Sequence, residues 1–203
     1  MDYCYDKECI VTVGGSEAID LAFRAIINPG DEVILLQPSY VAYTPGVALA
    51  GGKVVNIELK EDNEFKLTPE LLEAAITPKT KAILLNYPSN PTGGFMTRED
   101  YEKIVSIIKK HEIIVITDEI YAELSYEQKF CSIAAFDEIK DQVILVSGYS
   151  KAYAMTGWRL GYVLANEVLT KAMNKIHQYV IMSAPTGAQY GAIEAMRHCD
   201  NEN

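Results

Sequence analysis

The sequence predicts an α/β fold, a three-layer α/β/α sandwich built on a mostly parallel sheet of about seven strands. Short apolar, β-branched segments alternate with segments of helical periodicity, which is typical of β-α-β units and a parallel sheet. The strand segments are continuous apolar runs, as expected of strands covered by helices on both faces. The 203 residues contain no internal repeat and no low-complexity linker, so we expect one domain over residues 1–203.

Seven strands are expected from runs of apolar and β-branched residues bounded by turn residues. They span residues 9–13, 32–36, 54–59, 81–86, 113–117, 142–147 and 160–165. Residues 60–66 are charged and are expected to form a solvated loop. Residues 87–94 contain too many prolines, glycines and asparagines to form a regular element.

Helices are expected between the strands. Ser16 is a good N-cap for a helix over 17–27, and Thr68 followed by Pro69 marks the start of another. The clearest apolar stripe predicts a helix over 97–111. Residues 38–50 are expected to be helical, with Pro45-Gly46 either interrupting this helix or beginning it. From Glu167 onward the pattern is helical again, with an interruption near 184–187.

Composition excludes several classes of function. The formal net charge of −10 argues against binding to nucleic acids or membrane surfaces, which require basic patches. The four cysteines form no C-x-x-C pair, so we expect free thiols in a reducing cytosol. No apolar run reaches the length of a transmembrane helix, and the N-terminal residues lack the features of a secretory signal. We therefore expect a cytoplasmic protein.

Four polar clusters follow predicted strands, where open α/β sheets bind ligands. They are Gly14-Gly15-Ser16, Asn90-Pro91-Thr92-Gly93, Asp118 to Tyr121, and Ser147 to Lys151. Each cluster alone has an ordinary alternative. A Gly-Gly pair can be a simple chain reversal, an aspartate at a strand end can be an N-cap, and Tyr40 and Tyr121 can be aromatics at the edge of the core.

The Ser147–Lys151 cluster suggests the chemistry most directly. Lys151 lies where the chain leaves a buried strand, flanked by Ser147 and Ser150 and followed by Arg159. A lysine amine with a depressed pKa reacts with carbonyl groups, and arginine binds phosphate with two parallel hydrogen bonds. The backbone N–H groups of Gly15 and Ser16, at the start of a helix, favour a phosphate as well. The alternative for Lys151 is a surface lysine in a polar loop.

The combination of motifs resembles one family. The strings Val13-Gly-Gly-Ser-Glu-Ala-Ile19, Asn90-Pro-Thr-Gly93, Asp118-Glu-Ile-Tyr121 and Ser150-Lys-Ala-Tyr-Ala-Met-Thr-Gly-Trp-Arg-Leu-Gly-Tyr162 are similar to those of the class I/II, fold-type I pyridoxal-phosphate aminotransferases. They occur in the order and at the spacing of that family, and the resemblance covers essentially the whole chain.

The resemblance implies roles around the cofactor ring. Lys151 would hold pyridoxal 5'-phosphate as a lysine aldimine and later transfer a proton as a general base. Asp118 would pair with the protonated pyridine nitrogen, which keeps the ring an electron sink. Asn90 and Tyr121 would hydrogen-bond the ring's 3′-oxygen, and Tyr40 would stack on the ring face.

The resemblance also implies a phosphate site. Arg159, Gly15 and Ser16 would hold the phosphate, with Ser147 or Ser150 as further candidates. The family often has a serine three residues before the lysine, where this chain has Gly148. Position 148 therefore offers the phosphate no side-chain contact.

Chains of the family are about twice this length, so we expect this chain to be a large-domain fragment, with the N-terminal arm and small domain largely absent. The arginine that binds the substrate's α-carboxylate is expected outside this chain. The implied function is an aminotransferase that moves an amino group between an amino acid and a 2-oxo acid and acts as a homodimer. Alternatives are a C–S β-lyase or a cyclopropane-forming synthase on the same fold, or a truncated cofactor-binding domain without turnover.

Overall fold

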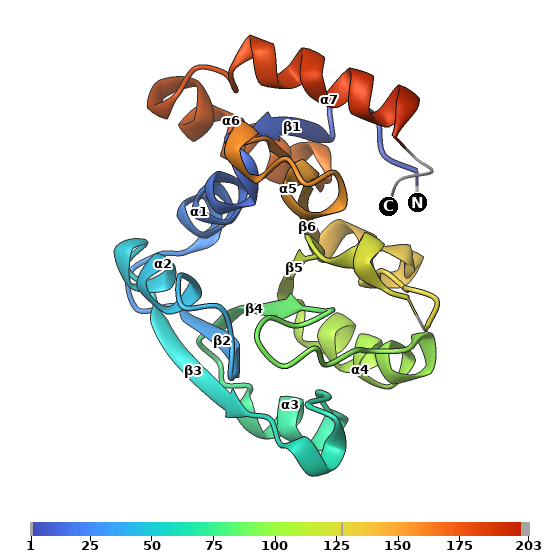
Figure 1. The fold of residues 1–203 in the computed structure, drawn as a ribbon. Helices are drawn as coiled ribbons and strands as arrows, with labels where there is room; N and C mark the ends of the chain where they lie inside the picture. Colours follow the sequence, from blue (N-terminus) through green and yellow to red (C-terminus); the bar gives the residue numbers. More distant parts are fainter. Residues whose placement is uncertain (1, 127, 200–203) are drawn as a thin grey trace.

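A seven-stranded sheet forms the centre of the molecule in the computed structural model, which describes residues 2–126 and 128–199 (Figure 1). The strands lie in the order β1-β7-β6-β5-β4-β2-β3. Their bounds are β1 Cys9–Thr12, β2 Glu32–Gln37, β3 Lys53–Glu58, β4 Thr80–Asn86, β5 Ile114–Asp118, β6 Val143–Gly148 and β7 Gly161–Ala165. All seven predicted strands are present, which confirms the expected fold class.

The sheet is mostly parallel. Neighbouring strands from β3 to β6 all pair in parallel, whereas β7 is antiparallel to both of its neighbours, β6 and β1. The register places Asn86 of β4 opposite Asp118 of β5, and Asp118 opposite Val146 of β6. The carboxyl ends of these three central strands therefore meet at one edge of the sheet, where open α/β sheets bind ligands.

Helices cover both faces, which completes the three layers (Figure 1). The helices are α1 Gly14–Ile26, α2 Tyr43–Leu49, α3 Pro69–Ala75, α4 Arg98–His111, α5 Tyr149–Ala152, α6 Glu167–Val180 and α7 Thr186–His198. Helices α1, α2 and α6 contact one face of the sheet, and α3 and α4 cover the other. Helix α7 lies across the end of the molecule near β1 and α5.

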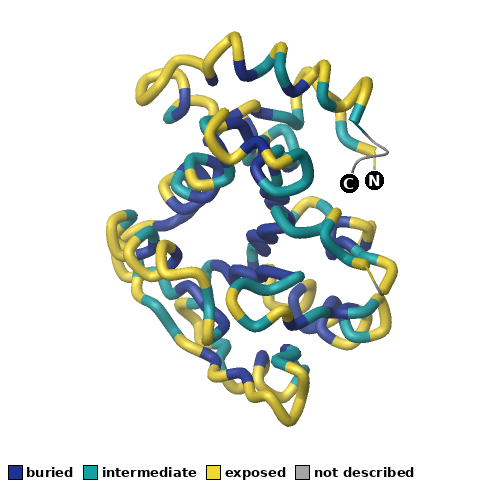
Figure 2. The backbone as a smooth tube through the Cα atoms, in the orientation of Figure 1, coloured by how far each residue is buried: buried dark blue, intermediate teal, exposed yellow. Residues whose placement is uncertain are grey.

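Strand alternation divides the core into two parts. Along β6, Ile144 and Val146 belong to the cluster beneath α1, whereas Val143 and Leu145 belong to the cluster beneath α4. Successive side chains of a strand point to opposite faces, so the two clusters fill the two sides of one sheet. Buried residues accordingly follow the sheet and the inner sides of the helices, while α7 is mainly exposed (Figure 2).

Two helix starts differ from the prediction. Helix α1 begins at Gly14 with Val13 as its N-cap, so Ser16 lies inside the first turn and is not the cap. The Glu17 carboxylate accepts the Val13 N–H instead. Helix α2 begins at Tyr43 and contains Pro45 in its first turn, where a missing N–H costs nothing. The predicted N-cap Thr68 is confirmed, whereas Thr97, predicted as the first residue of a helix, is the N-cap of α4.

The four cysteines all lie in the described part of the chain, and none forms a disulfide. No helix within residues 2–126 and 128–199 has the length and apolar character needed to cross a bilayer.

Candidate active site

A cavity of about 260 Å³ opens at the carboxyl edge of the central strands. Its lining comes from α1, from α2 and the loop before it, from the ends of β4 and β5, and from α5 with the turn that follows. The lining residues are Gly15, Ser16, Ile19, Tyr40, Tyr43, Asn86, Asn90, Asp118, Ile120, Tyr121, Ser150, Lys151, Thr156 and Arg159. The four polar clusters noted in the sequence therefore meet in one place.

One end of the cavity is suited to an anion. The first turn of α1 supplies backbone N–H groups without carbonyl partners in the helix, together with the positive end of the helix dipole. Arg159 lies against this turn: a Cβ at Gly14 would come within 2.5 Å of its guanidinium. The backbone of Gly14 has a φ of 71°, and Arg159 itself adopts a left-handed conformation with a φ of 52°. The positive φ thus favours glycine at position 14, and a side chain there would displace the Arg159 guanidinium.

Glycines also bring α1 close to the sheet. A Cβ at Gly161 of β7 would lie 2.6 Å from the carbonyl carbon of Gly14 and 2.7 Å from the nitrogen of Gly15. A Cβ at Gly148 would in turn lie 2.8 Å from the Cα of Gly161. The three backbone segments pack without side chains between them. This packing leaves no room for a larger residue at position 148, so the glycine found there is structurally required.

Asp118 lies at the floor of the cavity and is buried. Its Oδ2 accepts a hydrogen bond of 2.8 Å from the Tyr43 hydroxyl, and its Oδ1 accepts one of 3.2 Å from the Ile120 N–H. Burial raises the pKa of Asp118, while these two hydrogen bonds oppose that rise. Among the residues that the structure describes, no lysine, arginine or histidine forms an ion pair with this carboxyl group.

Asn86 connects the ends of β4 and β5 to the loop that carries Asn90. Its side-chain Nδ2 donates to the Asp118 carbonyl at 2.9 Å, and its Oδ1 accepts from the Asn90 N–H at 3.0 Å. Asn86 is buried, so both hydrogen bonds form away from solvent. One amide side chain therefore fixes the backbone of Asn90 relative to Asp118.

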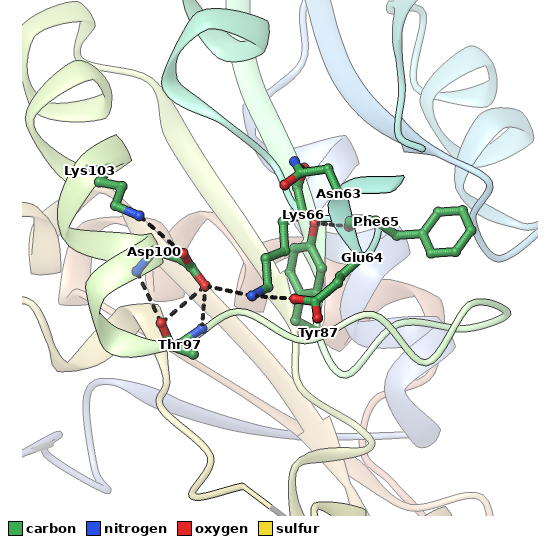
Figure 3. A network of polar contacts seen from close by, with 8 residues as sticks. All are labelled: Asn63, Glu64, Phe65, Lys66, Tyr87, Thr97, Asp100 and Lys103. Carbon is green, nitrogen blue, oxygen red and sulfur yellow. Dashed lines mark hydrogen bonds and ion pairs between the residues drawn. The ribbon is translucent and has the colours of Figure 1, made fainter. Parts of the chain in front are cut away.

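A polar network outside the cavity holds the other end of this loop (Figure 3). The Tyr87 hydroxyl donates to the Phe65 carbonyl at 3.0 Å, and Lys66 Nζ lies 3.4 Å from Asp100 Oδ2. Asp100 and Thr97 form a reciprocal capping box at the start of α4. The loop between Tyr87 and Thr97 is thus anchored at both ends.

Lys151 lines the same cavity as the anion end. It belongs to the short helix α5, and its Nζ lies 5.6 Å from the centroid of the Tyr121 ring. Thr156 Oγ1 donates to the Ser150 carbonyl at 2.9 Å, and Arg159 donates to the Thr156 carbonyl at 3.0 Å. These two hydrogen bonds tie the end of α5 to the turn that carries the arginine.

The structure brings nine of the ten predicted site residues together. Gly15, Ser16, Tyr40, Asn90, Asp118, Tyr121, Ser150, Lys151 and Arg159 all line the cavity. Ser147 does not line the cavity. Its side chain points to the same face of the sheet as Leu145, the face that α4 covers, and its hydroxyl donates to the Glu119 carbonyl at 3.4 Å. Of the two further serine candidates, Ser147 and Ser150, only Ser150 lines the cavity.

Five lining residues were not predicted: Ile19, Tyr43, Asn86, Ile120 and Thr156. Asn86 has a signal in the sequence, because it is a polar residue at the carboxyl end of an apolar strand. Tyr43 has no comparable signal. It is a buried aromatic in a short helix, and only its partner Asp118, far along the chain, shows that its hydroxyl faces the site.

The arrangement combines three chemical features in one cavity: an amine, an anion site, and a buried carboxylate without a cationic partner. The carboxylate can accept a cationic N–H from a ligand, and the amine can react with a carbonyl group. Within the described ranges, no group of three or more histidine, cysteine, aspartate or glutamate side chains is arranged to hold a metal ion.

Comparison with known proteins gives consistent matches. The family model for "Aminotransferase class I and II" matches residues 2–203. A putative aminotransferase, YugH, from Bacillus subtilis is 51% identical over 98% of this chain, and a probable N-acetyl-LL-diaminopimelate aminotransferase from the same organism is 43% identical over 96%. The crystal structure of an aromatic aminotransferase from Pyrococcus horikoshii superposes with a TM-score of 0.93 at 37% identity, over 96% of this chain.

The chain spans about half the length of these relatives. It covers 51% and 49% of the two Bacillus proteins and 52% of the Pyrococcus chain.

Proposed function

Because the chain belongs to the class I and II aminotransferase family, we propose that residues 1–203 are the cofactor-binding large domain of a pyridoxal-phosphate-dependent aminotransferase. One observation carries the proposal: a single cavity is lined by Lys151, by Arg159 and by the buried Asp118. The Arg159 guanidinium lies against the first turn of α1. The reaction would move an amino group between an amino acid and a 2-oxo acid.

The cavity fits pyridoxal 5'-phosphate, the cofactor of this family. Asp118 is buried without a cation of the described chain beside it, which suits a ligand whose ring nitrogen carries a proton. The first turn of α1 and Arg159 suit the phosphate. Tyr40 is part of the lining and supplies an aromatic ring for stacking. When bound, the cofactor would supply an electron sink for the bond-breaking step at the substrate's Cα.

The residues of the chain then have distinct tasks. Lys151 Nζ is the amine that would bind the cofactor's aldehyde carbon and, when free, would move the proton at the substrate's Cα. Asp118 would hold the proton on the ring nitrogen. Asn90 and Tyr121 would bind the ring oxygen next to the aldehyde. Ser150, Gly15 and Ser16 would hold the phosphate with Arg159.

The relatives support an amino acid and a 2-oxo acid as substrates, and they do not agree on one amino acid. The second Bacillus relative is named as a probable N-acetyl-LL-diaminopimelate aminotransferase, and the Pyrococcus relative is named as an aromatic aminotransferase. We further propose a homodimer in the cytoplasm. The dimer is supported by large apolar side chains exposed on α6, on α7 and in the turn between them, because such patches mark interaction surfaces. They are Tyr179, Val180, Ile181, Met182 and Tyr190. The unpaired cysteines suit a reducing compartment.

The experiment is a titration of the purified chain with pyridoxal phosphate, followed by borohydride reduction and peptide mapping. We expect the reduced label on Lys151, and its loss in Lys151→Ala. The matched control is Lys175→Ala, which removes an exposed lysine of α6 outside the cavity and should leave labelling of Lys151 unchanged. Labelling that persists in Lys151→Ala would contradict the assignment. Amino-group transfer by the full-length protein, or β-elimination in its place, would then decide between the aminotransferase and a lyase.

A further inference from the structure

The contact between Tyr43 and Asp118 points to a function for a residue outside the recognised motifs. We propose that Tyr43 is a positioning residue, which keeps Asp118 ionised and oriented to receive the protonated ring nitrogen of the cofactor. The proposal rests on the proposed function, because it concerns the same cavity.

The geometry leaves Tyr43 a specific task. Of the two oxygens of Asp118, Oδ1 is bonded to the Ile120 N–H, which follows from the local turn of the chain. Oδ2 is bonded to the Tyr43 hydroxyl at 2.8 Å, and this is the one side-chain hydrogen bond to the carboxyl group among the described residues. It comes from α2, far from β5 in the sequence. Tyr43 therefore fixes the rotation of the carboxyl group, which the backbone bond alone leaves free to turn.

The hydroxyl of Tyr43 is held in place. The residue is 1% exposed, so its hydroxyl has no access to bulk solvent as an alternative partner. Its ring contacts the Tyr40 ring edge to face, with centroids 5.5 Å apart. A buried donor fixed in this way loses little freedom when it bonds to the carboxylate.

The surroundings of Tyr43 and Asp118 show that Tyr43 is the donor of their hydrogen bond. Burial, with the nearby Asp118 carboxylate, raises the pKa of Tyr43 far above its ordinary value, so the phenol stays protonated and donates. Burial raises the pKa of Asp118, and the Tyr43 hydrogen bond is the largest effect that lowers it. Tyr40, Tyr121, Lys151 and Arg159 are the other titratable groups that line the cavity.

Glu119 is the titratable neighbour of Asp118 along the strand. Its carboxylate accepts a hydrogen bond from the Thr117 hydroxyl, and the two side chains point to the same face of the sheet. This is the face that α4 covers. Burial already outweighs the two hydrogen bonds to Asp118, so loss of the Tyr43 hydrogen bond shifts Asp118 further toward the neutral acid. A neutral Asp118 holds a protonated ring nitrogen poorly.

The first test needs no cofactor. The Asp118 carboxyl carbon is followed by ¹³C NMR during a pH titration of the chain, with Asp118→Asn to assign its signal. We expect Tyr43→Phe to raise the midpoint by about one pH unit, because a hydrogen bond to a charged group is removed. The matched control is Tyr87→Phe, which removes another buried hydroxyl whose partner is the Phe65 carbonyl, and should leave the midpoint unchanged. Superimposable titrations of Tyr43→Phe and the wild type would overturn the proposal.

The second test measures the affinity for pyridoxal phosphate and for its analogue with a C–H group in place of the ring nitrogen. We expect Tyr43→Phe to weaken binding of pyridoxal phosphate up to about tenfold at pH values between the Asp118 midpoints of the wild type and the variant, with recovery as the pH rises and Asp118 ionises. Binding of the analogue should not change. Equal weakening of both ligands at every pH would show a packing role and overturn the proposal.

The two tests separate the proposal from the function on which it rests. If the wild type binds neither ligand, the proposed function and the ring-nitrogen role both fail. The NMR titration then still decides whether Tyr43 keeps Asp118 ionised.

Discussion

Glu17 Oε1 lies 2.8 Å from His177 Nδ1, and this contact joins the first turn of α1 to α6. The two side chains are 11% and 7% exposed, and the second oxygen of Glu17 accepts the Val13 N–H. A single carboxylate thus fixes the start of the helix that forms the anion end of the cavity, and connects that helix to its neighbour.

Removal of Glu17 should destabilise the protein by more than a surface ion pair does. We expect Glu17→Ala to cost about 1–3 kcal/mol, because it leaves the buried His177 and the Val13 N–H without a partner. Glu167→Ala is the control, since its contacts with Lys171 and Lys7 are exposed and are expected to contribute about 1 kcal/mol or less. Urea unfolding of both variants measures the difference. Equal losses would contradict the structural role of the buried contact.

Glu119 should make stability depend on pH near neutrality. Burial raises its pKa to about 7, although hydrogen bonds from Ser132 and Thr117 oppose the rise. Because the pKa of Glu119 in the folded protein lies above the unfolded value of 4.5, its protonation contributes to stability. This contribution is complete below pH 4.5 and is lost as the pH rises through 7.

Glu119→Gln removes that loss. We expect its stability relative to the wild type to increase by about 3 kcal/mol between pH 4 and pH 8.5, as measured by urea unfolding. Glu138→Gln, at an exposed position, should follow the wild type throughout. Parallel curves for Glu119→Gln and the wild type would show that Glu119 ionises normally in the folded protein.

Gly161→Ala should damage both stability and the anion end. The added Cβ would lie 2.6 Å from the Gly14 carbonyl carbon, so α1 must move away from the sheet. We expect a loss of about 1–3 kcal/mol and weaker binding of pyridoxal phosphate. Gly187→Ala in α7 is the control, because its Cβ meets no atom within 4 Å, and alanine favours a helix by up to about 1 kcal/mol. Wild-type affinity in Gly161→Ala would argue against this close approach.

The network of Figure 3 should stabilise α4 at neutral pH and lose its effect in acid. Burial alone would raise the pKa of Asp100, but hydrogen bonds from Thr97 and the charge of Lys66 give a net lowering. The stabilisation is therefore present above the unfolded pKa of 3.8 and is lost as the pH falls below it.

The corresponding variant is Asp100→Asn. We expect a loss of about 1 kcal/mol at pH 7, typical of a helix cap, and little difference from the wild type near pH 2. Urea unfolding at the two pH values measures this. The control is Glu102→Gln, whose ion pair with Arg98 lies exposed on the same helix. A difference that persisted undiminished at pH 2 would rule out the charge of Asp100 as its cause.

The strands and the positions of the polar clusters could be predicted because both depend on local pattern. Apolar runs mark buried strands, and the residues after Asn86, Thr117 and Val146 necessarily fall at one edge of a parallel sheet. The capping residue Thr68 was predictable for the same reason, because its partner lies within the next turn.

The remaining features depend on contacts distant in sequence or on the exact strand face. The partner of Tyr43 is Asp118, and the partner of Glu17 is His177, so neither contact leaves a local signal. Ser147 was placed at the site because it is near Lys151, but strand alternation turns it to the opposite face. The start of α1 is fixed by a side chain inside the helix, which masks the usual signature of an N-cap.

The pairing of β1 with β7 has a consequence for biosynthesis. Cys9 pairs with Leu164, and β7 is the one strand beside β1 among the residues that the structure describes. A ribosome adding about 5–20 residues per second completes β7 on the order of ten seconds after β1. During that interval, the apolar side of α1 lacks the β6 and β7 surface on which it packs. The apolar residues of α1 therefore stay uncovered in the nascent chain until then, and the anion end of the cavity forms only after Arg159 has emerged.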